Sequence, residues 1–448
     1  MKLQEVSIKK LFGIFDHTIN LNLDRGITIV IGENGLGKTK ILEIIESFFK
    51  GEFYKLKSIE FESLIFKFND GVIWQIFKNE DQKKEISFTI IQRKDELEES
   101  SFIFELDLYE LYETGEIRRE AMLLGRMHDS LRRVSPNEWE HSYTGEIYSA
   151  LEIVKKFGKL DVKYRLKNKL ESDLIVPKWF INRLEKIQIS IIETQRVFNF
   201  ENLDRSPIET VEKYSRELVG LIKQKLTEST ELSSKLDRTY PNRLVDKLKK
   251  GNLNISQDEL NKALLELEDK RSLLDEVGLV ETDKNSDIFR IDNSEDIVKN
   301  VLMQYVNDSF EKLSIYDDIA GKIRLLLKII NERFKHKKLY VNKENGFSFK
   351  STVLKEGNLY RQIPLEQLSS GEKNELILFY HLIFNTSPNS LILIDEPEIS
   401  LHISWQNKFI SDLKEIHNLN KLDIIIATHS PDIIANYWDL KVELKGVE

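Results

Sequence analysis

The segment from residue 27 to residue 39 reads ITIVIGENGLGKT, and it is the strongest indication of the fold in this sequence. Its first five residues are almost all apolar, which is typical of a strand buried on both faces of a parallel sheet. The last eight fit the spacing G-x-x-x-x-G-K-[ST], in which glycines let backbone N–H groups turn towards phosphates. Apolar residues at helical spacing follow, from Ile41 to Phe48. Strand, glycine turn and helix together predict a phosphate-binding loop.

Each part of this loop has an expected role. The N-terminus of the following helix favours an anion through its exposed N–H groups and its dipole. Lys38 is expected to neutralise the β- and γ-phosphates of ATP, and the hydroxyl of Thr39 is expected to ligate Mg²⁺. The predicted nucleotide-binding residues of this loop are Gly32, Glu33, Asn34, Gly35, Gly37, Lys38, Thr39 and Lys40.

Three later segments offer partners for this loop. Residues 391–397 read LILIDEP, an apolar strand that ends in two acids, so Asp395 is expected to hold Mg²⁺ and Glu396 to act as general base. Residues 368–374 read LSSGEKN, where small residues before a helix can present N–H groups and hydroxyls to an anion. Residues 424–431 read IIIATHSP, which places His429 after a buried strand, within reach of the γ-phosphate.

The order of these four segments resembles an ABC-type ATPase head, with Walker A, signature, Walker B and histidine-switch motifs. Ser370 and Glu372 replace the first glycine and the glutamine of the usual signature, as in the SMC-like and OLD-like branches. The resemblance implies that two copies sandwich ATP, with Ser369, Ser370 and Gly371 contacting the nucleotide on the other copy's Lys38. It also implies a glutamine loop in IIETQR, with Gln195 touching Mg²⁺ and the attacking water, and a D-loop at residues 399–402.

More narrowly, the phrases IIETQR, LSSGEKNELILFY, LILIDEPEISLHISWQ and ATHSPDII are similar to ATPase subunits of Septu-type anti-phage defence systems. That resemblance implies a homodimer or higher homo-oligomer and a separate nuclease subunit of the HNH type. Only residues 430–448 follow the histidine motif, so no TOPRIM nuclease domain is expected there. The eight histidines are scattered along the sequence, whereas an HNH nuclease site needs paired histidines, so the nuclease is expected in a separate protein. DNA or another nucleic acid is a possible further partner. The sequence does not specify the trigger that is sensed, the stoichiometry of the complex or the effect of ATP turnover on the nuclease.

The fold class expected is α/β: an ABC-type P-loop ATPase head, with a mixed core sheet, an antiparallel subsheet and helical insertions that form an arm. Amphipathic patterns in the middle of the chain fit either a coiled-coil arm or a compact helical domain. The expected divisions are residues 1–95 (N-terminal lobe), 96–185 (a mainly helical insertion), 186–204 (the glutamine-loop strand), 205–337 (the arm) and 338–448 (C-terminal lobe).

Composition narrows the functional classes. The 448 residues carry 66 Lys and Arg against 75 Asp and Glu, a formal net charge of −9, so the whole surface is not a general polyanion binder. The absence of cysteine excludes disulfides, zinc-thiolate sites and iron–sulfur clusters. No run of 18 apolar residues and no signal-peptide core is present, so a cytoplasmic protein without a membrane partner is expected.

Three functions compete at this point. The leading one is an ATPase that assembles through its heads and regulates a separate nuclease. The second is an SMC-like or RecF-like DNA repair ATPase, which shares the head and the helical arm but works without a dedicated nuclease. The third, a transporter ATPase subunit, is disfavoured by the large insertion between Gln195 and Ser369.

Overall fold

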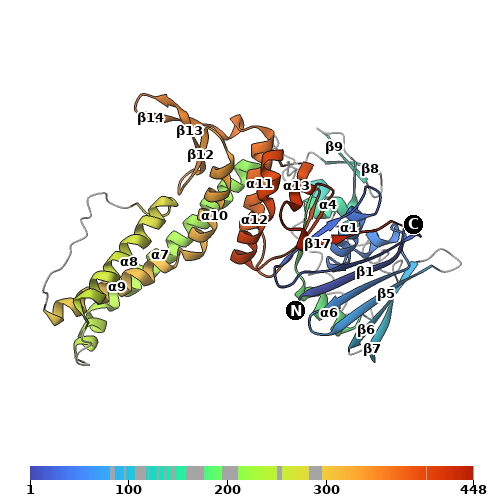
Figure 1. Ribbon diagram of the computed structural model, residues 1–448, viewed down its shortest axis with the longest axis horizontal. Coiled ribbons are helices and arrows are strands. Elements are labelled where there is room, and N and C mark those ends of the chain that lie inside the picture. The colour runs from blue at the N-terminus through green and yellow to red at the C-terminus, as the bar shows by residue number, and fades with distance from the viewer. Residues whose placement is uncertain are drawn as a thin grey trace. The chain divides into compact units, whose positions relative to one another are not determined.

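The structure is a computed structural model (Figure 1). It describes residues 1–446 except 81–85, 95–96, 106–117, 120, 129–130, 136–137, 143–146, 158–175, 194–209, 250–254, 282–294 and 400. The chain divides into two compact units. Unit 1 combines residues 1–209 with residues 385–448, and unit 2 is residues 210–384.

The core sheet of unit 1 has five strands in the order β11-β15-β16-β3-β17, and every described pairing in it is parallel. The strands are β3 (Ile27–Ile31), β11 (Ile189–Glu193), β15 (Leu391–Asp395), β16 (Asp423–Thr428) and β17 (Lys441–Glu443). The central three are almost completely buried, as their continuous apolar runs predict. Parallel pairing brings the carboxyl ends of all five strands to one edge.

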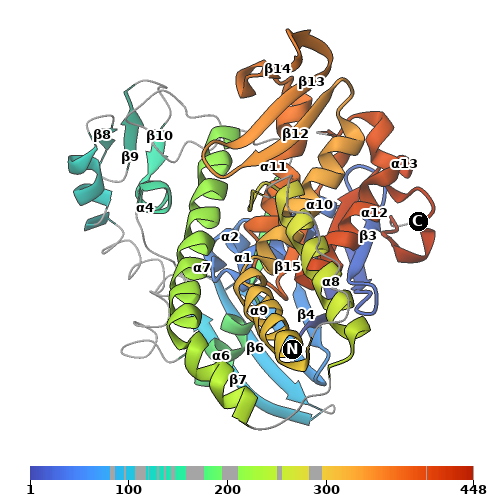
Figure 2. The same cartoon turned by 90° about the vertical axis from the view of Figure 1, so that its left-hand side faces the viewer.

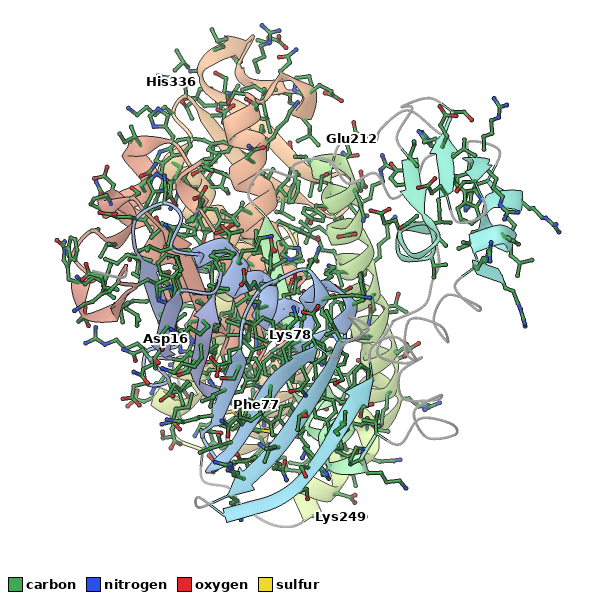
Figure 3. All side chains as sticks on the ribbon, turned by 90° about the vertical axis from the view of Figure 1, so that its right-hand side faces the viewer. Asp16, Phe77, Lys78, Glu212, Lys249 and His336 are labelled. Carbon is green, nitrogen blue, oxygen red and sulfur yellow. The ribbon has the colours of Figure 1, made fainter. Side chains whose placement is uncertain are left out.

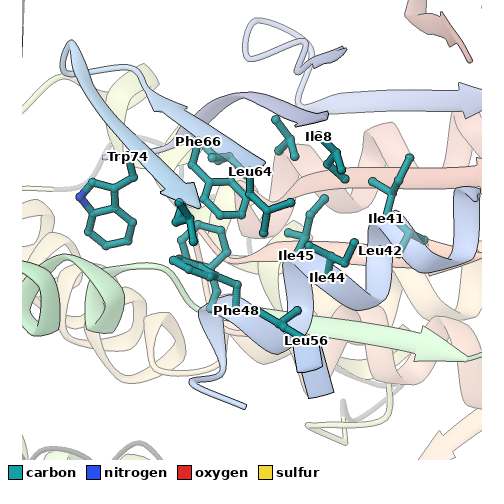
Figure 4. Packing of buried hydrophobic residues seen from close by; sticks show 14 of the residues in the cluster. Ile8, Ile41, Leu42, Ile44, Ile45, Phe48, Leu56, Leu64, Phe66 and Trp74 are labelled. Atoms are coloured by element: carbon teal, nitrogen blue, oxygen red, sulfur yellow. The ribbon is translucent and has the colours of Figure 1, made fainter. Parts of the chain in front are cut away.

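A second sheet in unit 1 is antiparallel and confirms the expected subsheet. Its order is β2-β1-β4-β5-β6-β7, with β1 (Leu3–Leu11), β2 (Phe15–Asn20), β4 (Ser63–Phe68), β5 (Val72–Glu80), β6 (Ile86–Lys94) and β7 (Leu97–Glu105). Helix α1 (Lys38–Phe49) packs its apolar face into a cluster with this sheet and the short helix α2 (Phe53–Lys57). Figure 4 shows Phe48 among Phe66, Leu64 and Leu56 in that cluster.

Residues 96–185 were expected to be mainly helical, but their described part is divided between strands and helices. Besides β7 it contains a helical segment at residues 121–127, a three-stranded sheet, β10-β9-β8, and two further helices. These elements are β8 (Leu131–Ser135), β9 (Glu138–His141), β10 (Ile147–Ser149), α4 (Ala150–Phe157) and α6 (Lys178–Lys186). Trp139 is buried in a small separate core there. Unit 1 ends with α12 (Ile403–Asn420), α13 (Pro431–Ile434) and short 3₁₀ turns at Pro397–Ile399 and Trp438–Leu440.

Unit 2 contains the helical arm. Helix α7 (Thr210–Lys249) has 40 residues, about 60 Å at 1.5 Å per residue. Glu212 and Lys249 mark its two ends in Figure 3. Helices α8 (Gln257–Glu276) and α9 (Asp296–Ser314) pack beside each other, and α9 also packs on α7 (Figures 1 and 2). A capping box formed by Ser256 and Glu259 opens α8.

The rest of unit 2 leads to the signature segment. Helix α10 (Asp317–Arg333) is followed by a three-stranded antiparallel sheet and by helix α11 (Ser370–Phe384). The strands are β12 (Lys337–Asn342), β13 (Gly346–Glu356) and β14 (Leu359–Ile363). The dipeptide Asn345-Gly346, which is typical of hairpin turns, lies where the chain passes from β12 to β13. Among the described residues, no helix is long and apolar enough to cross a lipid bilayer.

Candidate nucleotide-binding site

The glycine turn between β3 and α1 has the geometry of a phosphate cradle. Gly35 and Gly37 have φ angles of 91° and 87°, a left-handed conformation that favours glycine. A Cβ atom on Gly37 would also lie 2.6 Å from a Leu11 methyl carbon, whereas one on Gly35 would meet no atom within 4 Å. Gly37 is therefore required by both backbone and packing, and Gly35 by backbone alone.

Lys38 fills the centre of this turn. Its side chain is buried, and its Nζ donates hydrogen bonds to the carbonyls of Gly32 (2.8 Å) and Glu33 (3.0 Å). The loop is thus closed around an ammonium group at the N-terminus of α1, where an anion is also favoured by the helix dipole. Glu33 and Asn34 lie exposed at the rim.

A histidine that the sequence reading did not single out supports the same loop. His17 of β2 is buried, and its Nε2 donates to the carbonyl of Leu36 (2.9 Å), which can only accept. Burial lowers the pKa of His17 below 6.5, although its bond to Leu36 acts in the opposite direction. The imidazole of His17 therefore holds the loop from β2. No spacing in the sequence links residues 17 and 36.

The acids after β15 lie beside the loop. The hydroxyl of Thr39 is hydrogen-bonded to the carboxylate of Asp395. Burial raises the pKa of Asp395, the Thr39 bond opposes that, and the charges of Glu396, Glu398 and Glu43 raise it further. A cation would relieve this accumulation of negative charge, and carboxylate and hydroxyl oxygens are ligands that suit Mg²⁺. The residues present therefore fit a magnesium ion.

Protein groups alone do not form a complete metal cage in the described part of the chain. No group of three or more His, Cys, Asp or Glu side chains there has the geometry to hold an ion. Mg²⁺ usually takes one or two carboxylates and completes its shell with water and substrate phosphates. The pair formed by Thr39 and Asp395 is of that kind.

Glu396 occupies an unusual backbone position. Its φ is 44°, in the left-handed region that non-glycine residues rarely adopt. Its N–H donates to the carbonyl of Ala427 (2.9 Å), across the turn from β15 to the 3₁₀ helix at Pro397–Ile399. The chain therefore holds the predicted base at the end of β15 by a bond to the neighbouring strand β16.

His429 follows β16 and faces the same acids. Its Nδ1 is 3.0 Å from Oε1 of Glu398 and 3.9 Å from Oε1 of Glu396. The sequence reading did not assign Glu398. A third acid in LILIDEPEIS was the available signal, but its contact to a residue 31 positions away depends on the pairing of β15 with β16.

The signature segment belongs to unit 2. Ser369 and Glu372 form a capping box at the start of α11: Glu372 N donates to Ser369 Oγ (3.3 Å), and Ser369 N donates to Glu372 Oε2 (2.8 Å). Lys337 donates to the same Oε2 (2.7 Å). Burial raises the pKa of Glu372, but the bonds from Lys337 and Ser369 outweigh it and leave that pKa lowered. Ser369 and Ser370 are exposed, and Gly371 has open space around its Cα.

The structure thus brings together, in unit 1, the predicted loop, Asp395, Glu396 and His429. Lys40 lies on the first turn of α1 and pairs with Glu43 (2.6 Å). Gln195, which follows β11 in the sequence, lies outside the described residues. Ser400 of the predicted D-loop lies outside them too. The role assigned to Gln195 stays a prediction.

Comparison with known proteins gives one family. A family model, AAA_15, described as an AAA ATPase domain, matches residues 1–434. The SMC head domain from Thermotoga maritima is 11% identical over 100% of both chains, with a TM-score of 0.30. An SmcHead bound to the C-winged helix domain of ScpA is 12% identical over 97% of this chain and 92% of that one, with a TM-score of 0.31. Both likenesses are too weak to carry an argument, and no curated protein matches.

Proposed function

Because the chain belongs to the AAA ATPase domain family, we propose that it binds ATP with Mg²⁺ in unit 1 and hydrolyses it to ADP and phosphate. One observation carries the proposal. Lys38, the Thr39–Asp395 pair and the Glu396–His429 pair gather at the carboxyl ends of β3, β15 and β16. Ligands of open parallel sheets bind at such an edge.

Binding would use the loop and its lysine. The N–H groups of the turn and of α1 would cradle the phosphates, and Lys38 would exchange its bonds to Gly32 and Glu33 for phosphate oxygens. Thr39 and Asp395 would hold Mg²⁺, with Gln195 as a further expected ligand. The bound ion would supply charge neutralisation at the phosphate oxygens.

Hydrolysis would use the acids and the histidine. Glu396 would accept a proton from the attacking water, because its carboxylate is held at the sheet edge by the strained turn. His429 would contact the γ-phosphate from the end of β16. Its position beside Glu396, 3.9 Å between Nδ1 and Oε1, puts both groups at the same end of the site.

Two substitutions test this assignment. Lys38→Ala should abolish ATP binding, because it removes the buried charge of the loop. Glu396→Gln should bind ATP normally but lower kcat at least about 100-fold, because an amide cannot take up the proton. Binding is measured with a fluorescent ATP analogue, and hydrolysis by phosphate release. A Glu396→Gln variant that turns over ATP at the wild-type rate would refute the role of Glu396.

The active form is proposed to be a homodimer or higher oligomer of ATPase heads. Ser369, Ser370 and Gly371 stand at the N-terminus of α11, which can receive an anion. Ser369 would exchange its bonds to the carboxylate of Glu372 for that anion. The resemblance to ABC-type heads supports a sandwich in which this segment contacts the nucleotide bound by another copy. ATP should therefore shift the Glu396→Gln variant to a larger species in light scattering, and ADP should not.

The proposed biological role is anti-phage defence through regulation of a separate nuclease subunit of the HNH type. The similarity of four sequence phrases to Septu-type ATPase subunits supports it. Purification of the tagged protein expressed from its own operon should recover a nuclease, and Lys38→Ala should remove protection in phage plating assays. Recovery of the protein without any nuclease, with full protection by Lys38→Ala, would contradict this role.

A DNA repair ATPase of the SMC-like or RecF-like kind is the second candidate. The arm formed by α7, α8 and α9 favours it, because such ATPases carry long helices beside the head. This candidate expects DNA to stimulate ATP hydrolysis in the isolated protein. DNA-stimulated hydrolysis by a protein that has no neighbouring nuclease gene would favour this candidate over the defence ATPase.

A further inference from the structure

We propose that Glu398 is a positioning residue that holds the His429 ring through a proton on Nδ1, so that Nε2 faces the γ-phosphate. The proposal rests on the proposed ATPase function and deepens it. It starts from the hydrogen bonds of one carboxylate oxygen. Oε1 of Glu398 accepts from the hydroxyl of Thr428 (2.7 Å) and from the backbone N–H of His429 (3.0 Å). It also lies 3.0 Å from Nδ1 of the His429 ring.

The two donors to Glu398 belong to one continuous segment of backbone at the end of β16. Thr428 is the last residue of β16 and is fully buried, and the backbone of His429 continues directly from it. The side chain of Glu398 is 8% exposed, whereas that of His429 is 48% exposed. A buried carboxylate anchored by two donors of β16 and its continuation therefore provides a fixed point for a partly exposed ring.

The chemistry of the pair sets the proton on the ring. A carboxylate can only accept hydrogen bonds, so at 3.0 Å the Nδ1 of His429 must be the donor. The other ring nitrogen, Nε2, is then free to face a ligand. When the ring carries a second proton, Nε2–H becomes a donor suited to a phosphate oxygen. Without Glu398, the ring could rotate, so that Nε2 no longer faces the γ-phosphate.

The neighbouring groups support this assignment. Glu396 is farther from the same Nδ1, at 3.9 Å, and is the expected base for water, so it is not the orienting partner. Gln406 supports the turn from the other side, since its Nε2 donates to the carbonyls of Glu398 (3.4 Å) and Leu401 (3.3 Å). Its Oε1 accepts from the hydroxyl of Ser430 (2.9 Å). The segment that carries His429 is thus bonded to both Glu398 and Gln406.

The first test reads the tautomer without nucleotide. In full-length protein with ¹⁵N-labelled histidine, the His429 signals are assigned from their loss in His429→Ala. The wild type should show a proton on Nδ1, and Glu398→Ala should move it to Nε2 or give averaged signals. A wild-type ring without a proton on Nδ1, or an unchanged ring in Glu398→Ala, overturns the proposal. This result does not depend on ATP hydrolysis, so it separates the proposal from a failure of the proposed function.

The second test asks whether Glu398 acts through His429. Glu398→Ala should lower kcat at least about tenfold while the KM for ATP changes less than about threefold, because a positioning loss falls on the transition state. Glu398→Asp should recover part of the activity. The double variant Glu398→Ala/His429→Ala should be no slower than His429→Ala alone. Fully additive losses overturn the proposal.

A matched control separates positioning from general damage to unit 1. Asp439→Asn removes a carboxylate of the same unit that pairs with Arg25 at the surface. It should leave kcat and KM at wild-type values. If it lowers kcat as much as Glu398→Ala does, the loss in the Glu398 variant is not specific to His429, and the positioning role is wrong.

Discussion

At the scale of single residues, the predicted base is held in a conformation that costs stability. Glu396 has a φ of 44°, and a non-glycine residue in a sparsely populated backbone region costs about 1–3 kcal/mol. The surrounding structure imposes this angle, because the N–H of Glu396 bonds to Ala427 on the neighbouring strand. Strain of this kind at the end of a core strand is typical of a functional position.

This strain can be measured by comparing two small side chains at position 396. Both Glu396→Gly and Glu396→Ala remove the carboxylate, but only glycine relieves the left-handed backbone, so the glycine variant should be more stable by about 1 kcal/mol. Urea denaturation measures the difference. The same pair at Ser411, on the exposed face of α12, should give the opposite sign, because glycine weakens a helix by about 1 kcal/mol relative to alanine. Equal stability of the two position-396 variants would contradict the strain.

The residues that sequence analysis found and missed differ in one physical respect. The phosphate loop is local: its glycines, lysine and threonine lie within eight positions, so their spacing alone predicts their geometry. His17 and Glu398 act on residues 19 and 31 positions away, through strand pairings that no spacing specifies. Such supporting residues become visible only when the sheet is assembled.

At the scale of elements, α7 continues through a proline. Pro241 cannot donate the hydrogen bond that a helix needs at that point. Arg243 lies one turn or less away and donates to the carbonyl of Leu236 (2.8 Å) and to Asp308 of α9 (2.7 Å). Asp308 is only 6% exposed, so the side chain of Arg243 joins the interrupted turn of α7 to a buried acid on α9.

Breaking this contact should loosen the arm. Asp308→Ala should lower the free energy of unfolding by about 1.5–3 kcal/mol, because it removes hydrogen bonds between charged partners and leaves Arg243 without its acid. The matched control is Glu212→Ala, which breaks the exposed pair of Glu212 with Arg216 on the same helix and should cost only about 0.5 kcal/mol. Urea denaturation compares the two. Equal losses would show that the buried pair adds nothing to the arm.

The same helix pair shows why helical faces were only partly predictable. Residues Val211, Tyr214, Leu218, Leu221 and Ile222 lie at helical spacing, which predicts one apolar face of α7. All are buried except Leu221, which is 39% exposed. On α9, Val298, Leu302 and Tyr305 also lie at helical spacing and predict an apolar face, but Val298 and Tyr305 are exposed. The buried residues there include Asn300, Val306, Asp308 and Ser309. Asp308 is polar but buried, because its partner Arg243 lies on another helix. The spacing of apolar residues within one helix cannot predict such a contact.

At the scale of the whole molecule, the core sheet is built from both ends of the chain. β3 pairs with β16 and β17, which follow it by about 390 residues or more, and unit 2 interrupts the sequence between them. The sequence placed residues 338–448 in one C-terminal lobe. The structure instead groups residues 338–384, including the signature segment, with the helical arm. The division into compact units depends on contacts between residues far apart in the sequence. The boundary between Phe384 and Asn385, which falls between the signature and Walker B motifs, was therefore not predictable from those motifs.

The division of motifs between units leads to a test of the proposed sandwich by complementation. Lys38→Ala lacks a working loop in unit 1, and Ser369→Arg places a bulky charge on the signature segment of unit 2. Each variant alone should be inactive if every site combines the loop of one copy with the signature segment of another. A mixed pair would contain one intact combination, so equimolar mixing should restore up to about a quarter of wild-type ATP hydrolysis, since half of random pairs are mixed and each has one of two sites. Mixing Lys38→Ala with Lys38→Ala/Ser369→Arg is the control that should restore none. If the main mixture also stays inactive while both variants still assemble with wild-type protein, the nucleotide is not shared between copies.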